Sequence, residues 1–230
     1  MADFWGGAAE AIRLLASGDR EVWSVILRSL RISLSATAIS LLLGVPAGAW
    51  LALARFRGRS FVVGAVHAGM GLPPVVAGLL ISLLLFRGGP VGALGLLYTP
   101  TAMVIAQAVI AAPIVAGLTL SAVQSLDPRL RLLLRSLGAS QFREVWWLLR
   151  EARLPLLAAV IAGFGAVISE VGAAMMVGGN IKGETRVLTT ATILEVGRGE
   201  FETAIALSLV LLGLTYSVTL LLTLVQQRRR

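Results

Sequence analysis

Long apolar segments without charge alternate with short charged segments along this chain. A helix of about 20 apolar residues crosses a hydrocarbon core about 30 Å thick, and five segments reach that length. Only His67 and Glu170 place ionisable side chains inside them. The five predicted spans are Ile32–Ala54, Ser60–Phe86, Thr99–Val123, Leu154–Val177 and Thr203–Gln227. The pattern therefore predicts an all-α fold, a polytopic helical bundle in a membrane.

The composition supports a membrane location and excludes several kinds of chemistry. The chain is 57% hydrophobic and only 14% charged, whereas about a quarter of the residues in a soluble domain are charged. Because it has no cysteine, disulfides, thiolate metal sites and cysteine nucleophiles are excluded. No Walker A glycine loop, HExxH zinc motif or nucleophile elbow occurs. We therefore expect this chain to bind no metal or cofactor and to hydrolyse no ATP.

The net charge of +8 comes almost entirely from arginines that lie between the apolar segments. Membrane orientation explains that placement better than nucleic-acid binding, because cytoplasmic loops are rich in Arg and Lys. With the N-terminus outside and the C-terminus cytoplasmic, twelve of the 20 basic residues fall inside, including clusters at 55–59 and 228–230. Arg28 and Arg31 oppose this orientation. No nucleic-acid partner is expected.

The start of the chain differs from the rest. It lacks a basic stretch followed by an apolar core, so we expect no cleavable signal peptide. Residues Phe4–Ala16 are expected to form an amphipathic helix on the outer surface. We therefore divide the chain into an outer, interfacial segment at 1–31 and a transmembrane domain at 32–230.

The segment at 126–155, LDPRLRLLLRSLGASQFREVWWLLREARLP, is charged although apolar segments flank it. Asp127 suits a helix cap and Pro128 a first helical position. Gly138 suits a helix end, and Ser140 suits the cap of a second helix. The segment is therefore predicted to be a cytoplasmic loop of two short helices, with a docking surface at 127–153. The alternative is an ordinary basic loop at the membrane interface.

Two motifs in and after this loop carry a family resemblance. Leu137-Gly138-Ala139-Ser140 and the closing Leu154-Pro155 resemble the loop by which permeases of ATP-binding-cassette (ABC) importers contact their ATPases. Leu132-Leu133-Leu134 stands where that family has Glu-Ala-Ala, and the spacing from glycine to proline is about one helical turn longer. The segment Ser169–Thr190 is similar to the tungstate branch of the oxyanion permeases, whose relatives carry molybdate and sulfate.

The resemblance implies a type I ABC importer permease with five core transmembrane helices and cytoplasmic coupling helices. It implies import of an oxyanion, with tungstate favoured over molybdate or sulfate, in a prokaryotic cytoplasmic (inner) membrane. The implied partners are a second copy of the chain, two ABC ATPase subunits that hold ATP and Mg, an extracytoplasmic oxyanion-binding protein and the lipid bilayer. The residues implied in ATPase coupling are Asp127, Arg135, Leu137, Gly138, Ala139, Ser140, Glu144 and Pro155.

Three features mark candidates for the pathway or its gate. The pair Pro73-Pro74 breaks the second span, which is tolerated beside protein or a cavity. Glu170 lies in the fourth span as a gate or packing element, or as a structural contact with Ser169, Thr189 or Thr190. The glycine-rich stretch 178–183 has backbone N–H groups that could hold an oxyanion. The complete set is Pro73, Pro74, Ser169, Glu170, Gly172, Gly179, Asn180, Lys182, Thr185 and Arg186.

Other function classes stay open from the sequence. A secondary transporter is expected to show internal repeats and several ionisable groups in the membrane, and neither is evident here. A membrane scaffold without transport would leave the proline pair and the loop glycines without a role. His67 is expected to be a buried hydrogen-bonding group rather than a metal ligand.

Overall fold

Helices make up the whole fold of residues 4–227, the part of the chain that the computed structural model describes. They are α1 Phe4–Ala16, α2 Arg20–Leu53, α3 Arg59–Met70, α4 Pro74–Leu85, the 3-10 helix η1 Gly92–Leu94, α5 Pro100–Gln124, α6 Pro128–Ser136, α7 Gln141–Glu151, α8 Arg153–Ile168, α9 Gly172–Gly178, α10 Leu188–Arg198 and α11 Phe201–Gln227. The predicted all-α fold is confirmed.

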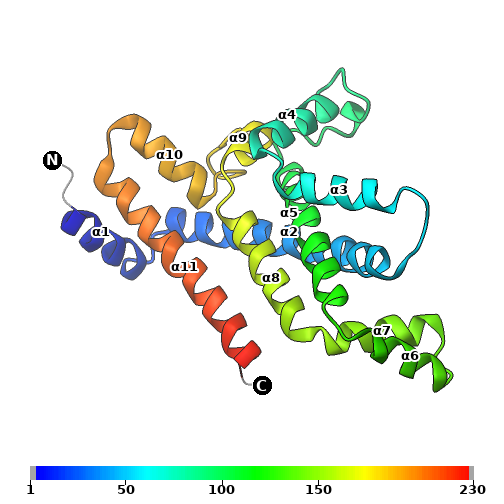
Figure 1. The fold of residues 1–230 in the computed structure, drawn as a ribbon. Coiled ribbons are helices and arrows are strands. Elements are labelled where there is room, and N and C mark those ends of the chain that lie inside the picture. Colours follow the sequence, from blue (N-terminus) through cyan, green and yellow to red (C-terminus); the bar gives the residue numbers. More distant parts are fainter. Residues whose placement is uncertain (1–3, 228–230) are drawn as a thin grey trace.

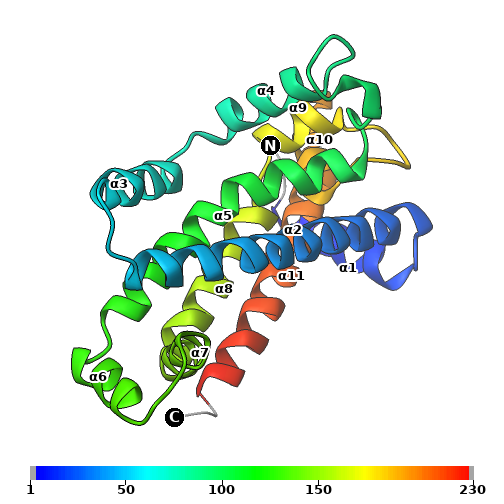
Figure 2. The ribbon, with the colours of Figure 1, turned by 90° about the vertical axis from the view of Figure 1, so that its right-hand side faces the viewer.

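Within these residues, α2, α5 and α11 are long and apolar enough to cross a membrane. The helix pairs α3–α4 and α7–α8 also pass as spans if each is counted as one, with bends of 101° and 74°. Figures 1 and 2 show α2, α5 and α8 packed together in the middle. The helices α6 and α7 lie at one end of this bundle, and α4, α9 and α10 lie towards the other.

Close approach of small residues builds the contact between α2 and α5. A Cβ on Gly48 would lie 2.3 Å from the Ala116 carbonyl oxygen, and one on Gly44 would lie 2.8 Å from Val115 Cβ. In a membrane, lipid is as apolar as the core, so helices associate through tight van der Waals packing at such small residues. These glycines therefore bring the two helices together along the centre of the bundle.

Helix α2 begins well before the predicted span at Ile32, because Asp19 caps it at Arg20. The Asp19 carboxylate accepts hydrogen bonds from the backbone N–H groups of Glu21 at 2.7 Å and Val22 at 3.1 Å. The helix therefore runs without a break across the proposed boundary between 31 and 32. The predicted helix at Phe4–Ala16 is confirmed as α1, which packs beside α11 (Figure 1).

Two of the predicted spans are broken helices. The predicted break at Pro73-Pro74 is confirmed, since α3 ends at Met70 and α4 begins at Pro74. The predicted fourth span, Leu154–Val177, is also broken, because α8 ends at Ile168 and α9 begins only at Gly172. Glu170 lies in this gap. The gap leaves backbone groups free, and side chains satisfy them, as described below.

Candidate functional site

Local capping builds the two short helices at 127–153 as the sequence predicts. The Asp127 carboxylate accepts a hydrogen bond from Arg129 N–H at 2.8 Å, and the Ser140 hydroxyl accepts one from Arg143 N–H at 3.5 Å. Gly138 has φ +76°, a conformation that glycine adopts without a steric cost. These residues end α6, turn the chain and start α7.

Glu144 ties the two short helices together. Its side chain on α7 is only 4% exposed and pairs with Arg131 Nε and, at 2.8 Å, with Arg135 Nε of α6. Burial raises the pKa of this carboxyl, but the hydrogen bonds and charges of Arg135 and Arg131 outweigh burial and hold the pKa below its usual value. Glu144 is therefore a stable carboxylate at neutral pH and fixes α6 against α7.

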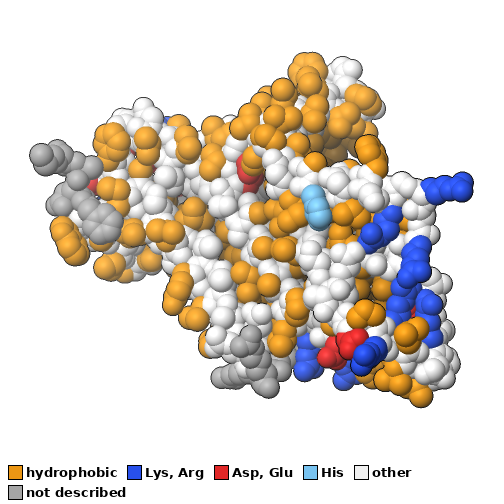
Figure 3. Space-filling model, viewed as in Figure 1, with side chains coloured by type: hydrophobic (Ala, Val, Ile, Leu, Met, Phe, Trp, Pro, Cys, Tyr) orange, Lys and Arg blue, Asp and Glu red, His pale blue; other side chains and the backbone are white. Residues whose placement is uncertain are grey.

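The outer faces of α6 and α7 expose large apolar side chains. Leu137 is 75% exposed and Phe142 82%, beside the exposed Trp146 and Trp147. The Arg150 guanidinium lies 5.0 Å from the Trp147 ring. Figure 3 shows Lys and Arg side chains gathered at this same end of the molecule. A mixed apolar and basic surface of this kind is typical of a contact with protein or with a membrane interface.

At the other end, the breaks of the second and fourth spans meet. A Cβ on Gly78 of α4 would lie 2.6 Å from Ala173 Cα of α9. One on Gly172 would lie 2.8 Å from Val75 Cγ2. The structure therefore brings the Pro73-Pro74 break, which is solvent-exposed in the single chain, next to Gly172, although a hundred residues of sequence separate them.

Glu170 is buried at this junction, with 7% of its surface exposed. Its Oε1 accepts a hydrogen bond from Ala173 N–H at 2.8 Å, and its backbone carbonyl accepts one from the Thr189 hydroxyl at 3.0 Å. Ser169 is exposed and donates to the Gly165 carbonyl at 2.7 Å instead. Of the partners considered for Glu170, Thr189 is the one found, and it bonds the backbone. The side chain caps the first turn of α9.

The loop at 178–187 is closed by its own hydrogen bonds. The Thr185 hydroxyl donates to the Gly178 carbonyl at 2.5 Å and accepts from Ile181 N–H at 2.9 Å. The N–H groups of residues 184, 185 and 186 all donate to the Ile181 carbonyl. Within the glycine-rich stretch 178–183, the N–H groups of Gly179 and Ile181 are therefore already used, by the Met175 carbonyl and the Thr185 hydroxyl.

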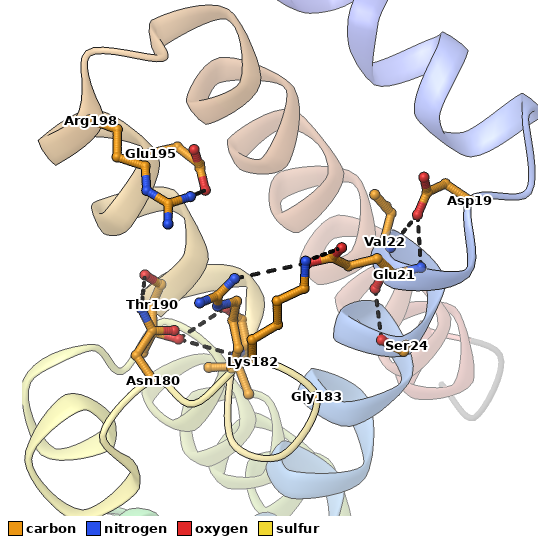
Figure 4. A network of polar contacts seen from close by, with 12 residues as sticks. Asp19, Glu21, Val22, Ser24, Asn180, Lys182, Gly183, Thr190, Glu195 and Arg198 are labelled. Carbon is orange, nitrogen blue, oxygen red and sulfur yellow. Dashed lines mark hydrogen bonds and ion pairs between the residues drawn. The ribbon is translucent and has the colours of Figure 1, made fainter.

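Three loop residues, Gly179, Asn180 and Gly183, adopt left-handed backbone conformations. Gly179 has φ +69° and Asn180 φ +51°. A Cβ on Gly179 would lie 2.8 Å from the Tyr98 ring, so close packing adds to the requirement for glycine here. Asn180 donates from its side chain to the Thr190 carbonyl at 3.3 Å (Figure 4). The candidates Gly179, Asn180 and Thr185 thus shape one rigid turn.

The first turns of α2, which precede the predicted span, hold this loop in place. Lys182 Nζ lies 2.7 Å from a Glu21 carboxylate oxygen, and Arg186 lies 3.9 Å from the other (Figure 4). Arg28 donates to the carbonyls of Gly183 at 2.6 Å and Arg186 at 2.9 Å. Sequence reasoning missed Glu21 and Arg28. Arg28 could have been found, because its position opposes the predicted orientation and therefore suggests that it has a local partner.

His67 does not behave as expected. It lies on α3, none of whose residues is buried, and it is exposed in the single chain. The expectation of a buried histidine was therefore wrong. Across residues 4–227 no cluster of three His, Asp or Glu side chains could hold a metal ion.

Most of the chain matches a protein family. Residues 44–230 match the model of the binding-protein-dependent transport system inner membrane component. The chain belongs to this family. The match begins within α2 and includes both short helices and the broken fourth span.

The chain is also similar to individual permease proteins over most of its length. The chain is 38% identical over 212 residues to the tungstate uptake system permease protein TupB of Peptoclostridium acidaminophilum, covering 92% of this chain and 93% of that protein. It is 40% identical over 203 residues to a probable anion ABC transporter permease protein of Haloferax volcanii, covering 86% and 88%. The molybdenum transport system permease protein ModB of Haemophilus influenzae is 32% identical over 176 residues, covering 71% and 76%.

Solved structures share the fold. The structure of the MetNI methionine ABC transporter in inward-facing conformations superposes with a TM-score of 0.71 at 19% identity, covering 94% of this chain and 95% of that chain. An amino acid ABC transporter gives a TM-score of 0.68 at 20% identity, covering 93% and 96%. The fold is that of type I ABC importer permeases, as predicted.

Proposed function

We propose that this chain is the permease subunit of an ATP-driven importer for an oxyanion, and that the oxyanion is tungstate. The observation that carries the proposal is the identity of 38% with a tungstate permease over nearly the full length of both chains. The relatives of lower identity include a molybdenum permease, so molybdate is the main competing substrate. The chain supplies the pathway and leaves ATP hydrolysis to a partner subunit.

The helices α6 and α7 are the docking surface for that ATPase, and we name them the docking helices. The two helices lie at one end of the bundle (Figure 1), and Leu137 in the turn between them and Phe142 on α7 are exposed. Glu144 pairs with arginines of α6, so the hairpin holds its shape as a unit. In this role two ATPase subunits bind ATP and Mg, one under each copy of the permease.

A second copy of the chain completes the pathway in this proposal. The helices α3 and α4 leave Phe61 82% exposed and Leu83 58% exposed, and they lie on one side of the bundle (Figure 2). A homodimer with a two-fold axis would place the junction of α4 and α9 beside the pathway. The residues at that junction, including Pro73, Pro74, Glu170 and Gly172, are then gate residues.

Orientation follows from the same proposal. The docking helices lie at the end where Lys and Arg side chains gather (Figure 3), and Arg131 of α6 donates to the Leu53 carbonyl, just before the Arg55–Arg59 cluster. Cytoplasmic loops are rich in Arg and Lys, so this end faces the cytoplasm and the N-terminus lies outside. An extracytoplasmic oxyanion-binding protein delivers its ligand at the opposite end, near the 178–187 loop.

Reconstitution tests the function directly. The permease with its ATPase is placed in liposomes, and ATP hydrolysis is measured with binding protein loaded in turn with tungstate, molybdate and sulfate. We expect stimulation by tungstate above the other two anions. Equal stimulation by molybdate would reassign the substrate. Uptake that follows a proton gradient without ATP would replace the proposal by a secondary transporter.

A further inference from the structure

A cavity separates the docking helices from the first span. Its volume is about 180 Å³, with Pro46, Trp50 and Leu53 of α2 on one side and Gln141 and Val145 of α7 on the other. The docking helices pack on each other, and α7 also packs on α8. The cavity therefore takes the place of close apolar packing between α7 and α2. A polar side chain connects the docking helices to α2 instead.

Arg131 is that side chain. Its Nε pairs with the buried Glu144 carboxylate, and one of its terminal nitrogens donates to the Leu53 carbonyl at 3.4 Å. Leu53 is the last residue of α2, and the free carbonyls at a helix end attract cations. Arg59 uses the same feature, since its Nε donates to the Leu51 carbonyl at 2.9 Å. Arg131 thus contacts α7 and α2 at once.

Arg135 provides a natural comparison on the same helix. It pairs with the same Glu144 carboxylate at 2.8 Å and is more exposed than Arg131, 55% against 30% of the side chain. Its described contacts are with Glu144 alone. Both arginines stabilise the α6–α7 hairpin, but Arg131 also reaches across to α2.

The other end of α2 is bound to the 178–187 loop. Glu21 pairs with Lys182, and Arg28 donates to two loop carbonyls. The helix between these ends has 34 residues, which is about 50 Å at 1.5 Å per residue. One continuous helix therefore contacts the docking helices at its inner end and the loop of the gate region at its outer end.

We infer that Arg131 is a positioning residue for coupling: it holds the docking helices to the inner end of α2 and so transfers their movement to the first span. The inference rests on the proposed function, because it assigns a coupling path to the same docking surface. It adds a residue that neither the loop motif nor the charge pattern singles out. Arg131 touches neither substrate nor nucleotide and acts through Glu144 and the Leu53 carbonyl.

The test compares R131Q with R135Q, because each removes one arginine from Glu144 and only R131Q also removes the contact with α2. Both are reconstituted with the ATPase and tungstate-loaded binding protein, and tungstate uptake is divided by ATP hydrolysed. We expect the ratio of R131Q to lie about fivefold or more below that of R135Q, because R135Q keeps the contact between Arg131 and the Leu53 carbonyl. Equal ratios in the two variants would overturn the inference. A wild-type complex that tungstate does not stimulate would instead overturn the proposed function.

A distance measurement keeps the inference testable if R131Q fails to assemble with the ATPase. The native chain has no cysteine, so spin labels can be placed alone at R55C, which follows the cavity-lining Ala54, and at Q141C, which replaces a lining residue on α7. We expect R131Q to broaden the distance distribution between the labels and R135Q to leave it narrow. Distributions that stay alike in all three proteins would refute the bridging role of Arg131.

Discussion

Two substitutions of Glu170 test whether its side chain is needed as a hydrogen-bond acceptor or as a charged group. Oε1 accepts the hydrogen bond of Ala173 N–H, and Ala173 is fully buried. Glu170→Ala leaves that N–H without a partner, which costs about 1–3 kcal/mol. Glu170→Gln keeps an acceptor oxygen at the same reach. The alanine variant should therefore be the more damaged of the two.

The assay is thermal unfolding of the purified permease together with uptake of labelled tungstate at matched membrane abundance. We expect Glu170→Gln to retain most uptake and most stability, and Glu170→Ala to lose part of both. The Thr189 hydroxyl bonds the backbone carbonyl of residue 170, so both variants keep that link and the comparison stays confined to the side chain. Complete loss of uptake in both variants, with normal stability, would refute the capping argument and indicate an essential charge.

Further substitutions and one titration test the remaining assignments. Gly78→Ala adds a Cβ 2.6 Å from a backbone atom of α9 and should cost about 1–3 kcal/mol in unfolding measurements. Gly64→Ala on α3 meets no atom within 4 Å and should stabilise by about 0.5–1 kcal/mol through helix propensity. Gly138→Ala forces alanine to φ +76°, at about 1–2 kcal/mol, and should weaken ATPase pull-down without altering the spans. Arg57→Cys should react with a membrane-impermeant thiol reagent only from the cytoplasmic side; labelling from outside would reverse the orientation. The lowered pKa of Glu144 contributes stability above its unfolded pKa of about 4.3, so amide protection factors in the docking helices, corrected for the intrinsic pH dependence of exchange, should fall as pH drops below that value, and Glu144→Gln should remove this dependence.

The sequence allowed the locally encoded parts of the fold to be predicted. Asp127 and Ser140 cap helices through hydrogen bonds to residues two or three positions ahead, and Gly138 adopts the left-handed conformation that its place between them indicated. The helix at Phe4–Ala16 and the break at Pro73-Pro74 are likewise properties of short segments. Each depends on chemistry within one or two turns, which the amino-acid order displays directly.

Contacts between distant segments were not predictable in the same way. Hydropathy treats Leu154–Val177 as continuous, because a cap such as Glu170 adds one charge to an otherwise apolar run. The break there exists because the side chain and the backbone of that residue find partners on α9 and α10. The bridge from Arg131 to Leu53 spans 78 positions, and nothing in either local sequence points to the other.

Several basic residues on the predicted outer side make local contacts in the structure, which changes how they count in the orientation argument. Arg28, Lys182 and Arg186 count against the proposed orientation, yet each has a fold-specific partner at the start of α2 or in the 178–187 loop. A residue retained for such a contact carries little information about which loops face the cytoplasm. On the other side, Arg55 and Arg57 are exposed in the short connection between α2 and α3, where the positive-inside bias acts on short loops. The orientation argument therefore rests on fewer arginines than the full count suggests, and it favours the docking end as cytoplasmic more strongly than that count does.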